Sequence, residues 1–342
     1  MSERNCEYKP PFVWFGGKSA VADRVWAALG DVDNYVEPFF GSGAVLFLRP
    51  DGPGKIETVN DADGFVANFW RALAADPDAV ADHADWPVNE ADLHARHLWL
   101  LGQRDRITER LMGDEAFYDA RVAGWWVWGL NCWIGSGWCS GKGPWVSVDG
   151  VLTLRNTGQG VNRKLPHLGD TGQGVNRKLP HLGNTGKGER REWLRAYLGE
   201  FAARLARVRV CCGDWSRVCG PSVTFKHGTT GVFLDPPYAD SAARTSDLYA
   251  VDCERVAHAV REWAIEQGRN PLMRIVLAGY EGEHDMPSDW RVEAWEAVGG
   301  YALAGTSDDA IGRKNKRRER LWMSPVCLSA KPDDAPLFGG VE

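Results

Sequence analysis

The most specific chemical signal in the chain is the tetrapeptide Asp235-Pro236-Pro237-Tyr238, which follows a short apolar run typical of a buried strand. The Asp235 carboxylate and the Pro236 carbonyl oxygen are two acceptors that can hold both hydrogens of one amino group. An exocyclic amine needs both hydrogen bonds to become a nucleophile. Its lone pair is delocalised into the ring, so the nitrogen must be drawn toward tetrahedral geometry. The prolines stiffen the loop, and a tyrosine ring can stack on a base, which is worth about 1–3 kcal/mol. The pattern predicts transfer of a methyl group to an exocyclic amine; the alternative is a plain proline-rich turn.

A second signal lies about two hundred residues earlier, where an apolar run ends and Gly41-Ser42-Gly43 leads into a helix start. Pro38 blocks further strand pairing, and glycines let the backbone approach a ligand closely. In an open α/β sheet the ligand crevice lies at the carboxyl ends of the strands, where this turn falls. The turn lacks the full glycine pattern of a dinucleotide site and the Lys-Ser/Thr ending of a phosphate loop. Taken alone, it is equally compatible with a structural turn.

Asp61 follows the next predicted strand, about twenty residues beyond the glycines. An acid at this place can accept hydrogen bonds from both ribose hydroxyls of a nucleoside cofactor. A helix N-cap is the equal alternative, because Asp also satisfies free N–H groups at a helix start.

Short apolar runs alternate with helix-compatible segments, which is typical of a parallel sheet covered by helices on both faces. The predicted strands are 35–40, 55–60, 208–212, 231–235 and 274–279, and the predicted helices are 19–29, 62–74, 191–205 and 253–266. We therefore expect an α/β protein with a Rossmann-like, doubly wound and mainly parallel sheet.

The alternation stops between 76 and 189, which we interpret as an inserted, mostly helical domain. This stretch has predicted helices at 90–112 and 115–133, and six tryptophans between 125 and 145 that we expect mainly in a core. It also holds a tandem repeat, since 156–169 and 170–183 match at thirteen of fourteen positions. A unit this short does not build a solenoid. The predicted organisation is a catalytic domain at 1–75 and 190–330, the insert at 76–189 and a tail at 331–342.

The formal net charge of −6 argues at first against a nucleic-acid partner, because phosphate contacts need Lys and Arg. The basic residues are concentrated, however. Residues 155–195 hold nine Lys or Arg against three acids, and 313–318 form a second basic cluster. An acidic body with two basic strips fits DNA binding on one face, with solvated surface as the alternative.

The remaining composition restricts the class of protein. No apolar run is long enough for a membrane span, and the N-terminal residues lack a signal-peptide pattern, so we expect a cytoplasmic protein. The eight cysteines form no CxxC pairs and indicate neither a zinc site nor a disulfide framework.

Together these motifs resemble the DNA adenine-N6 methyltransferases of the Dam type, whose motif order is called the alpha class. The resemblance runs through Pro11–Lys18, Glu37–Gly43, Asp61, Asp214 and Asp235–Tyr238. It continues at 248–249, 275–280 and 319–322 and fades in the insert. It implies the S-adenosylmethionine-dependent methyltransferase fold, S-adenosylmethionine as methyl donor, and double-stranded DNA as substrate. It also places a target-recognition domain between the glycine turn and the tetrapeptide, where the insert lies.

The resemblance implies roles for individual residues. Asp61 is expected on the cofactor's ribose, Asp214 on its adenine, Lys18 near its methionine carboxylate, and Trp14 at its border. The full set expected at the cofactor is Trp14, Gly17, Lys18, Glu37, Pro38, Phe39, Phe40, Gly41, Gly43, Asp61, Asp214, Trp215 and Asp235. The expected catalytic residues are Asp235, Pro236, Pro237 and Tyr238.

On the DNA side, a methyltransferase must extrude its target base from the stack, which costs a few kcal/mol. Phosphate contacts that help offset this cost are expected from Lys142, Arg163, Lys164, Arg177 and Lys178. We expect no metal and a monomer.

Two other functions remain open from the sequence. Cytosine-N4 methylation poses the same electronic problem, although Asp before Pro-Pro-Tyr and the motif order favour adenine. A DNA-binding protein that keeps the fold without catalysis is the second, and the intact tetrapeptide argues against it. The glycine-rich, duplicated insert and the Glu319–Trp322 segment are similar to bacteriophage members of the family, which raises a phage origin as a hypothesis.

Overall fold

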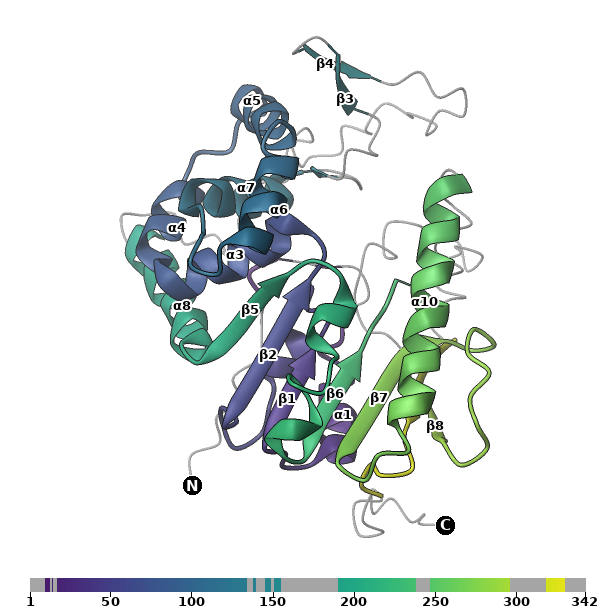
Figure 1. Cartoon of the computed structure of the whole chain (residues 1–342). Coiled ribbons are helices and arrows are strands. Elements are labelled where there is room, and N and C mark those ends of the chain that lie inside the picture. Colours follow the sequence, from purple (N-terminus) through teal and green to yellow (C-terminus); the bar gives the residue numbers. More distant parts are fainter. Residues whose placement is uncertain are drawn as a thin grey trace, which may run out of the picture. The chain divides into compact units, whose positions relative to one another are not determined.

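The computed structural model describes residues 10–12, 14, 17–133, 138–139, 145–148, 151–154, 190–237, 247–295 and 318–329 (Figure 1). The chain divides into two compact units. The first unit comprises Met1–Trp14 and Asn60–Trp215, and the second comprises Phe15–Val59 and Ser216–Glu342. The predicted domain boundaries at 75/76 and 189/190 stay predictions, and the tandem repeat lies outside the described residues.

Seven strands of the described residues form one sheet. They are β1 (Asn34–Glu37), β2 (Ile56–Asp61), β5 (Val208–Cys212), β6 (Thr230–Leu234), β7 (Met273–Tyr280), β8 (Arg291–Ala294) and β9 (Glu319–Met323). Their order is β5-β2-β1-β6-β7-β9-β8. β1 is parallel to β2 and β6, and β6 is parallel to β7, whereas β9 is antiparallel to both β7 and β8. The prediction of an α/β fold with a mainly parallel sheet is confirmed.

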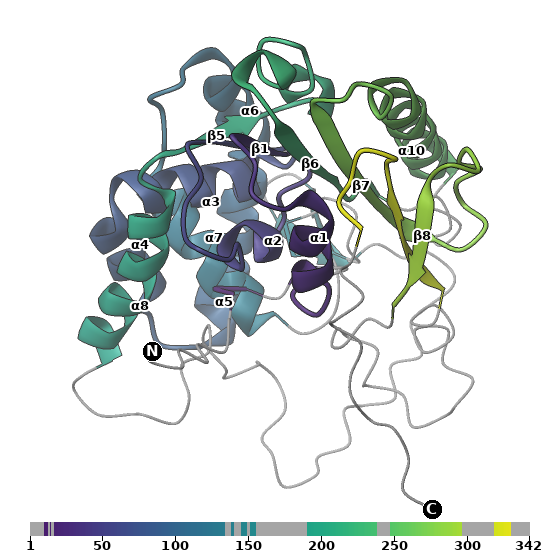
Figure 2. The same cartoon turned by 90° about the horizontal axis from the view of Figure 1, so that it is seen from below.

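In the second unit, helices lie on both faces of the sheet (Figure 2). α1 (Ala22–Leu29) and α2 (Ala44–Phe47) lie on one face, and α10 (Asp247–Gln267) lies on the other. All five residues of β6 are buried, as expected for a strand between two parallel neighbours under two helical layers. The indole N–H of Trp26 on α1 donates to the Val45 carbonyl on α2 at 2.7 Å, which joins the two helices of one layer.

The first unit is mainly helical. Its helices are α3 (Gly64–Ala75), α4 (Pro77–Ala84), α5 (Glu90–Leu101), α6 (Arg104–Gly113), α7 (Ala120–Cys132) and α8 (Arg190–Leu205). α3 packs against α6, α7 and α8, and nine of its twelve residues are buried. A helix that is apolar around its circumference is a core helix. A hairpin of β3 (Trp145–Val148) and β4 (Val151–Leu154) completes the described elements of this unit.

Arg71 holds α3 to its surroundings. Its Nη2 donates to the Val210 carbonyl on β5 at 3.0 Å. Its Nη1 donates to the Leu111 carbonyl in the last turn of α6 and to two carbonyls between α6 and α7. One guanidinium therefore satisfies four backbone acceptors, which fits its fork of donors. The contact ties the core helix of the first unit to the strand that leads to Asp214.

Several element boundaries differ from the prediction. The predicted helix 90–112 is two helices, because Gly102 ends α5 and a new helix starts at Arg104. The predicted helix 115–133 starts only at Ala120, where the Asp119 side chain accepts the Val122 N–H as an N-cap. The predicted strand 35–40 ends at Glu37, since Pro38 has no N–H to donate.

Several of the described elements were not predicted, among them α4, the hairpin strands β3 and β4, and the strands β8 and β9. α4 begins with Asp76 as its cap and Pro77 in its first turn, an arrangement that favours a helix start. β8 and β9 are short strands at one edge of the sheet, and their antiparallel pairing needs no crossover helix that the sequence pattern could reveal.

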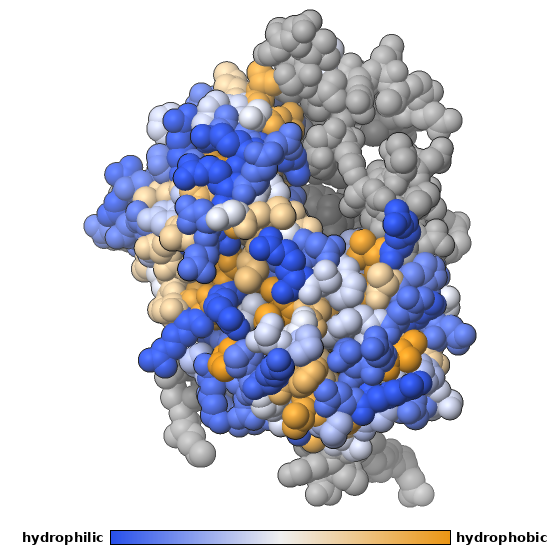
Figure 3. All heavy atoms as spheres, in the orientation of Figure 1, coloured by the Kyte–Doolittle hydropathy of each residue, from blue (hydrophilic) through white to orange (hydrophobic). Residues whose placement is uncertain are grey.

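No helix among the described residues is both long and apolar enough to span a bilayer. On the face drawn in Figure 3, hydrophobic and hydrophilic residues are intermixed over the described part.

A pair of helical glycines tests the packing of the first unit. A Cβ on Gly124 of α7 would clash with His83 Cβ and would lie 2.7 Å from the Val80 carbonyl oxygen of α4, whereas a Cβ on Gly199 of α8 would meet nothing within 4 Å. We expect Gly124→Ala to lower the free energy of unfolding by about 1–3 kcal/mol through overpacking. Gly199→Ala should raise it by about 0.5–1 kcal/mol through helix propensity. Urea unfolding measures both, and equal effects of the two substitutions would contradict the close α4–α7 contact.

Candidate active site

The order of the sheet reverses at β1. The chain passes from β1 to β2 and β5 on one side and then to β6 and β7 on the other. In open α/β sheets such a reversal opens a ligand crevice at the carboxyl ends of the two strands that flank it. These strands are β1, which ends at Glu37, and β6, which Asp235 follows. Their register pairs Val36 with Val232, so the glycine turn and the tetrapeptide lie at the same edge of the sheet in the second unit.

Steric constraints fix the glycine turn. Gly41 and Gly43 have φ of 48° and 74°, in the left-handed region that favours glycine. A Cβ on Gly43 would lie 2.6 Å from Phe47 Cε2 and 2.7 Å from Phe40 Cζ. The Gly43 N–H donates to the Phe40 carbonyl at 2.8 Å, and α2 begins at the next residue. The turn predicted from the sequence is therefore present, and its second glycine has no room for a side chain.

Glu37 is a buried acid at the end of β1. It is 2% exposed, and its Oε2 accepts a hydrogen bond from the Tyr35 hydroxyl at 2.8 Å. Burial, with the charge of Glu37 as a second cause, raises the pKa of Tyr35 well above its ordinary value. The hydroxyl therefore stays protonated at neutral pH and donates to the carboxylate, which holds the Glu37 side chain in one orientation.

An ion pair joins two segments that lie more than two hundred residues apart in the sequence. Lys18 Nζ lies 2.9 Å from Asp235 Oδ1, and the two side chains are 5% and 19% exposed. A cation this well buried needs a partner, because removing one member of a buried pair leaves an uncompensated charge. Among the described residues, no hydrogen bond falls on Asp235 Oδ2, so the second oxygen keeps its acceptor capacity.

The pair gives Lys18 a contact that the sequence analysis missed. The motif match suggested the cofactor's methionine carboxylate as the neighbour of Lys18, and no local pattern indicates a partner so distant in the chain. Trp295 was missed as well: it directly follows β8, is 4% exposed, and its ring centroid lies 5.8 Å from Lys18 Nζ. This distance is within the range of a cation–π interaction. A lone tryptophan after a short edge strand carries no sequence signal for such a role.

In the first unit, the structure brings Asp61 and Asp214 to adjacent strand ends. The Gly213 N–H donates to the Asp61 carbonyl at 3.1 Å, and Asn60 Nδ2 donates to the Gly213 carbonyl at 3.0 Å. The N-cap of α3 is Asp63, whose Oδ1 accepts the Phe65 N–H at 2.8 Å. The cap alternative for Asp61 is therefore not realised, and Asp61 Oδ1 instead accepts the Asp63 N–H at 2.9 Å.

The predicted aromatic neighbours of the cofactor have different surroundings. Trp14 is half-buried, with its ring centroid 5.8 Å from that of Phe12 and 6.2 Å from that of Trp126, in the aromatic core of the first unit. Trp215 is half-buried and opens the short helix η1 (Trp215–Val218), next to the exposed Asp214. Gly17 is exposed.

The expectation that the insert's tryptophans are mainly core residues holds for four of them: Trp126, Trp128, Trp133 and Trp138 are 0–7% exposed.

Several predicted site residues lie outside the described residues. These are Tyr238 and the expected phosphate contacts Lys142, Arg163, Lys164, Arg177 and Lys178. Pro236 is buried and Pro237 is exposed. Within the described part of the chain, no group of three or more His, Cys, Asp or Glu side chains could hold a metal ion.

Residues 14–118 match the model of the D12 class N6 adenine-specific DNA methyltransferases. The matched segment includes the glycine turn and Asp61 and ends before Asp214 and the tetrapeptide. None of the curated proteins matches the chain. The match gives no support for a bacteriophage origin, and the mainly parallel seven-stranded sheet is consistent with the S-adenosylmethionine-dependent methyltransferase fold. On this evidence, residues 14–118 of the chain are similar to the D12 class of N6 adenine-specific DNA methyltransferases.

Proposed function

We propose that the protein transfers a methyl group from S-adenosylmethionine to the N6 amine of a flipped adenine at specific sites in double-stranded DNA. One observation carries this proposal: Asp235 follows the buried central strand β6, next to the strand reversal, and Lys18 holds one of its carboxylate oxygens. The family match supports an adenine-specific enzyme.

The residues at the strand ends fit the chemistry of the methyl donor. S-adenosylmethionine supplies a methyl group that is activated by a positively charged sulfur. In the second unit, the buried Glu37 carboxylate can accept hydrogen bonds from an ammonium or hydroxyl group, and the glycine turn has no side chains at Gly41 and Gly43 to exclude a ligand. In the first unit, Asp61 and Asp214 are acceptors at neighbouring strand ends. We assign them to ribose and adenine, as the resemblance implies.

The tetrapeptide supplies the acceptors for the target amine. A carboxylate at neutral pH only accepts hydrogen bonds, and Lys18 already occupies Asp235 Oδ1, which leaves Oδ2 for one N–H of the amine. The Pro236 carbonyl oxygen accepts the other. Two acceptors oppose delocalisation of the nitrogen lone pair and so raise its nucleophilicity. Because Pro236 and Pro237 have fixed φ angles, the two acceptors keep their spacing as the base enters.

DNA binding is assigned to the insert. The target base must leave the stack before Asp235 can reach its amine, at a cost of a few kcal/mol. Lys142, Arg163, Lys164, Arg177 and Lys178 are our candidates for the phosphate contacts that offset this cost.

The first experiment identifies the methylated base. Purified protein, unmethylated DNA and S-adenosylmethionine with a labelled methyl group are incubated, and the DNA is digested to nucleosides. We expect label only in N6-methyldeoxyadenosine. Asp235→Ala should lower the transfer rate by at least about a hundredfold, the scale typical of a lost transition-state contact, while S-adenosylmethionine binding measured by equilibrium dialysis changes little. Label in N4-methyldeoxycytidine would support the cytosine alternative, and absence of label from DNA would contradict an active methyltransferase.

A double-mutant cycle separates the two roles available to Lys18. If Lys18 acts by holding Asp235, Lys18→Met should destabilise the wild type, and the same change in an Asp235→Asn background should cost less. The coupling in the free energy of unfolding should be about 0.5–3 kcal/mol, as for residues in direct contact. A contact of Lys18 with the methionine carboxylate would add a second effect: Lys18→Met would then weaken S-adenosylmethionine binding to a similar extent in both backgrounds. Absence of coupling in the free energy of unfolding would contradict a stabilising role for the ion pair. Lys18→Arg, which keeps the charge, is the control.

The glycine turn offers a matched pair of substitutions in the second unit. Gly43 and Gly52 have φ of 74° and 88°, but a Cβ on Gly52 would meet nothing within 4 Å. Both Gly→Ala changes should cost about 1–2 kcal/mol for the left-handed backbone. Only Gly43→Ala should also displace Phe40 and Phe47 and reduce S-adenosylmethionine affinity. Calorimetric titration checks this, and equal affinities for the two variants would contradict a cofactor role for the turn.

A further inference from the structure

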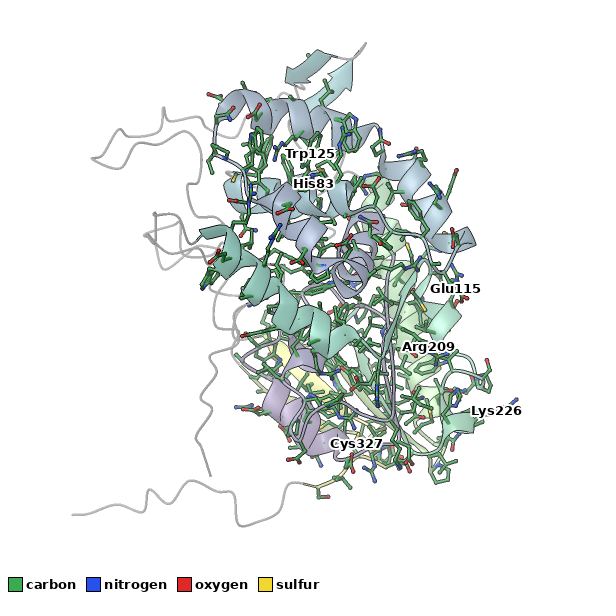
Figure 4. All side chains as sticks on the ribbon, turned by 90° about the vertical axis from the view of Figure 1, so that its left-hand side faces the viewer. His83, Glu115, Trp125, Arg209, Lys226 and Cys327 are labelled. Carbon is green, nitrogen blue, oxygen red and sulfur yellow. The ribbon has the colours of Figure 1, made fainter. Side chains whose placement is uncertain are left out.

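The first unit contains a cavity of about 490 Å³ formed by α4, α5, α7 and the α4–α5 connection. None of the predicted cofactor, catalytic or DNA-contacting residues lines it. Its size falls within the range of small-molecule sites, about 300–1,000 Å³. His83 and Trp125 lie close together on its wall (Figure 4), where α4 and α7 approach at Gly124.

Arg96 is the unusual group in this cavity. It is 7% exposed, and its guanidinium lies 4.8 Å from the ring centroid of Trp86, 4.8 Å from that of Trp125 and 4.4 Å from that of Trp128. Its Nη1 is buried and has no hydrogen-bond partner. Among the described residues, the guanidinium donates no hydrogen bond. Aromatic faces stabilise the charge, but they accept no conventional hydrogen bond, so the buried Nη1 is left without an acceptor.

Burial lowers the pKa of Arg96 to about 10, so the side chain remains a cation at neutral pH. A buried donor without an acceptor is unfavourable and is uncommon in proteins. A ligand that brings an acceptor oxygen or nitrogen to the guanidinium would remove this penalty.

The remaining lining selects the kind of ligand. Asp92 also lines the cavity: Trp86 Nε1 and Asn89 Nδ2 both donate to its Oδ2, and no hydrogen bond from the described residues falls on Oδ1. Asp82 is the second carboxylate, paired with Arg195 at 2.8 Å. Burial lowers the pKa of His83, which is therefore neutral at pH 7. With two carboxylates and one guanidinium on its wall, the cavity does not favour a phosphate.

Trp86 provides a surface for stacking. Arg96 lies against its ring, yet the residue is 44% exposed, and its backbone carbonyl is anchored by the Trp128 indole N–H at 3.0 Å. Trp99 and Trp125 form the other aromatic walls, with ring centroids 5.0 Å apart. These lining groups match a flat heteroaromatic ring that carries a hydrogen-bond acceptor next to a donor. Arg96 can donate to the ligand's acceptor, Asp92 can accept from its donor, and the indole rings can stack on its face.

We propose that this cavity binds an uncharged nucleobase, stacked on Trp86 and hydrogen-bonded by Arg96 and Asp92. The inference rests on the proposed function only in taking the DNA substrate as the source of the base. The site would hold an unstacked base other than the one that is methylated, since none of its residues belongs to the tetrapeptide or the glycine turn. It would thereby let the helical part of the chain retain a distorted DNA strand.

Free nucleosides test the site without requiring methyl transfer. Thymidine, deoxycytidine and deoxyguanosine are titrated separately into protein with ¹⁵N-labelled tryptophan, in an Asp235→Ala background that disables the proposed catalytic site. The Trp86 indole N–H resonance is assigned with Trp86→Phe. We expect at least one nucleoside to shift this resonance saturably. The indole resonance of Trp193, a residue on α8 that is 40% exposed and lies outside the cavity, should stay unchanged.

Two variants separate the cavity from general surface binding. Trp86→Ala should raise the nucleoside dissociation constant about tenfold, the scale of a lost stacking contact, and Trp193→Ala should leave it unchanged. Asp92→Asn provides a second variant that keeps the side-chain volume and should also weaken binding. No saturable shift at Trp86, or equal effects of the two tryptophan variants, would overturn the proposal. Competition by inorganic phosphate alone would overturn it in favour of an anion site. Loss of methyl transfer in the enzyme assay has no bearing on these readouts, so the two proposals can fail separately.

Discussion

The structure depends on the position of β1 between two parallel neighbours. Because β2 lies on one side of β1 and β6 on the other, the chain first adds strands on the β2 side and later crosses back to add β6 and β7 on the opposite side. This reversal brings a turn near the N-terminus and a tetrapeptide from the second half of the chain to one edge of the sheet in the second unit. Close packing then restricts both segments, through Gly43 between two phenylalanine rings and through the complete burial of β6.

An ion pair orients one of the acids that the sheet places at its strand ends. Lys18 and Asp235 compensate each other's charge at a place where the two side chains are only 5% and 19% exposed. The pair fixes one carboxylate oxygen and leaves the other to act as an acceptor. The arrangement resembles that of Glu37, where the Tyr35 hydroxyl holds a buried carboxylate at the end of β1. In both cases a neighbouring donor orients an acid at the end of a strand, which is the preorganisation that polar catalysis needs.

The sequence predicted the parts of this protein that follow from local pattern. The sequence shows five of the strands as short continuous apolar runs. It also shows the turn at Gly41–Gly43 and the tetrapeptide after β6, because each has a characteristic local sequence. Boundaries failed where one residue decides them: Gly102 divides a predicted helix, and Asp119 delays the start of another. The antiparallel edge at β9 was invisible because its pairing is non-local. The Lys18–Asp235 pair and the tryptophan cage of Arg96 were missed for the same reason, since each joins residues that no periodicity relates.

The separation between Lys18 and Asp235 also sets an order in time. During translation, Lys18 leaves the ribosome long before residue 235 has been made, and domains fold as their elements become available. Until the counter-charge arrives, transferring that ammonium out of water is unfavourable. The strand reversal requires the same wait, because β1 cannot acquire its second parallel neighbour before β6 emerges. The ion pair and the β1–β6 pairing therefore cannot form before residue 235 has been synthesised.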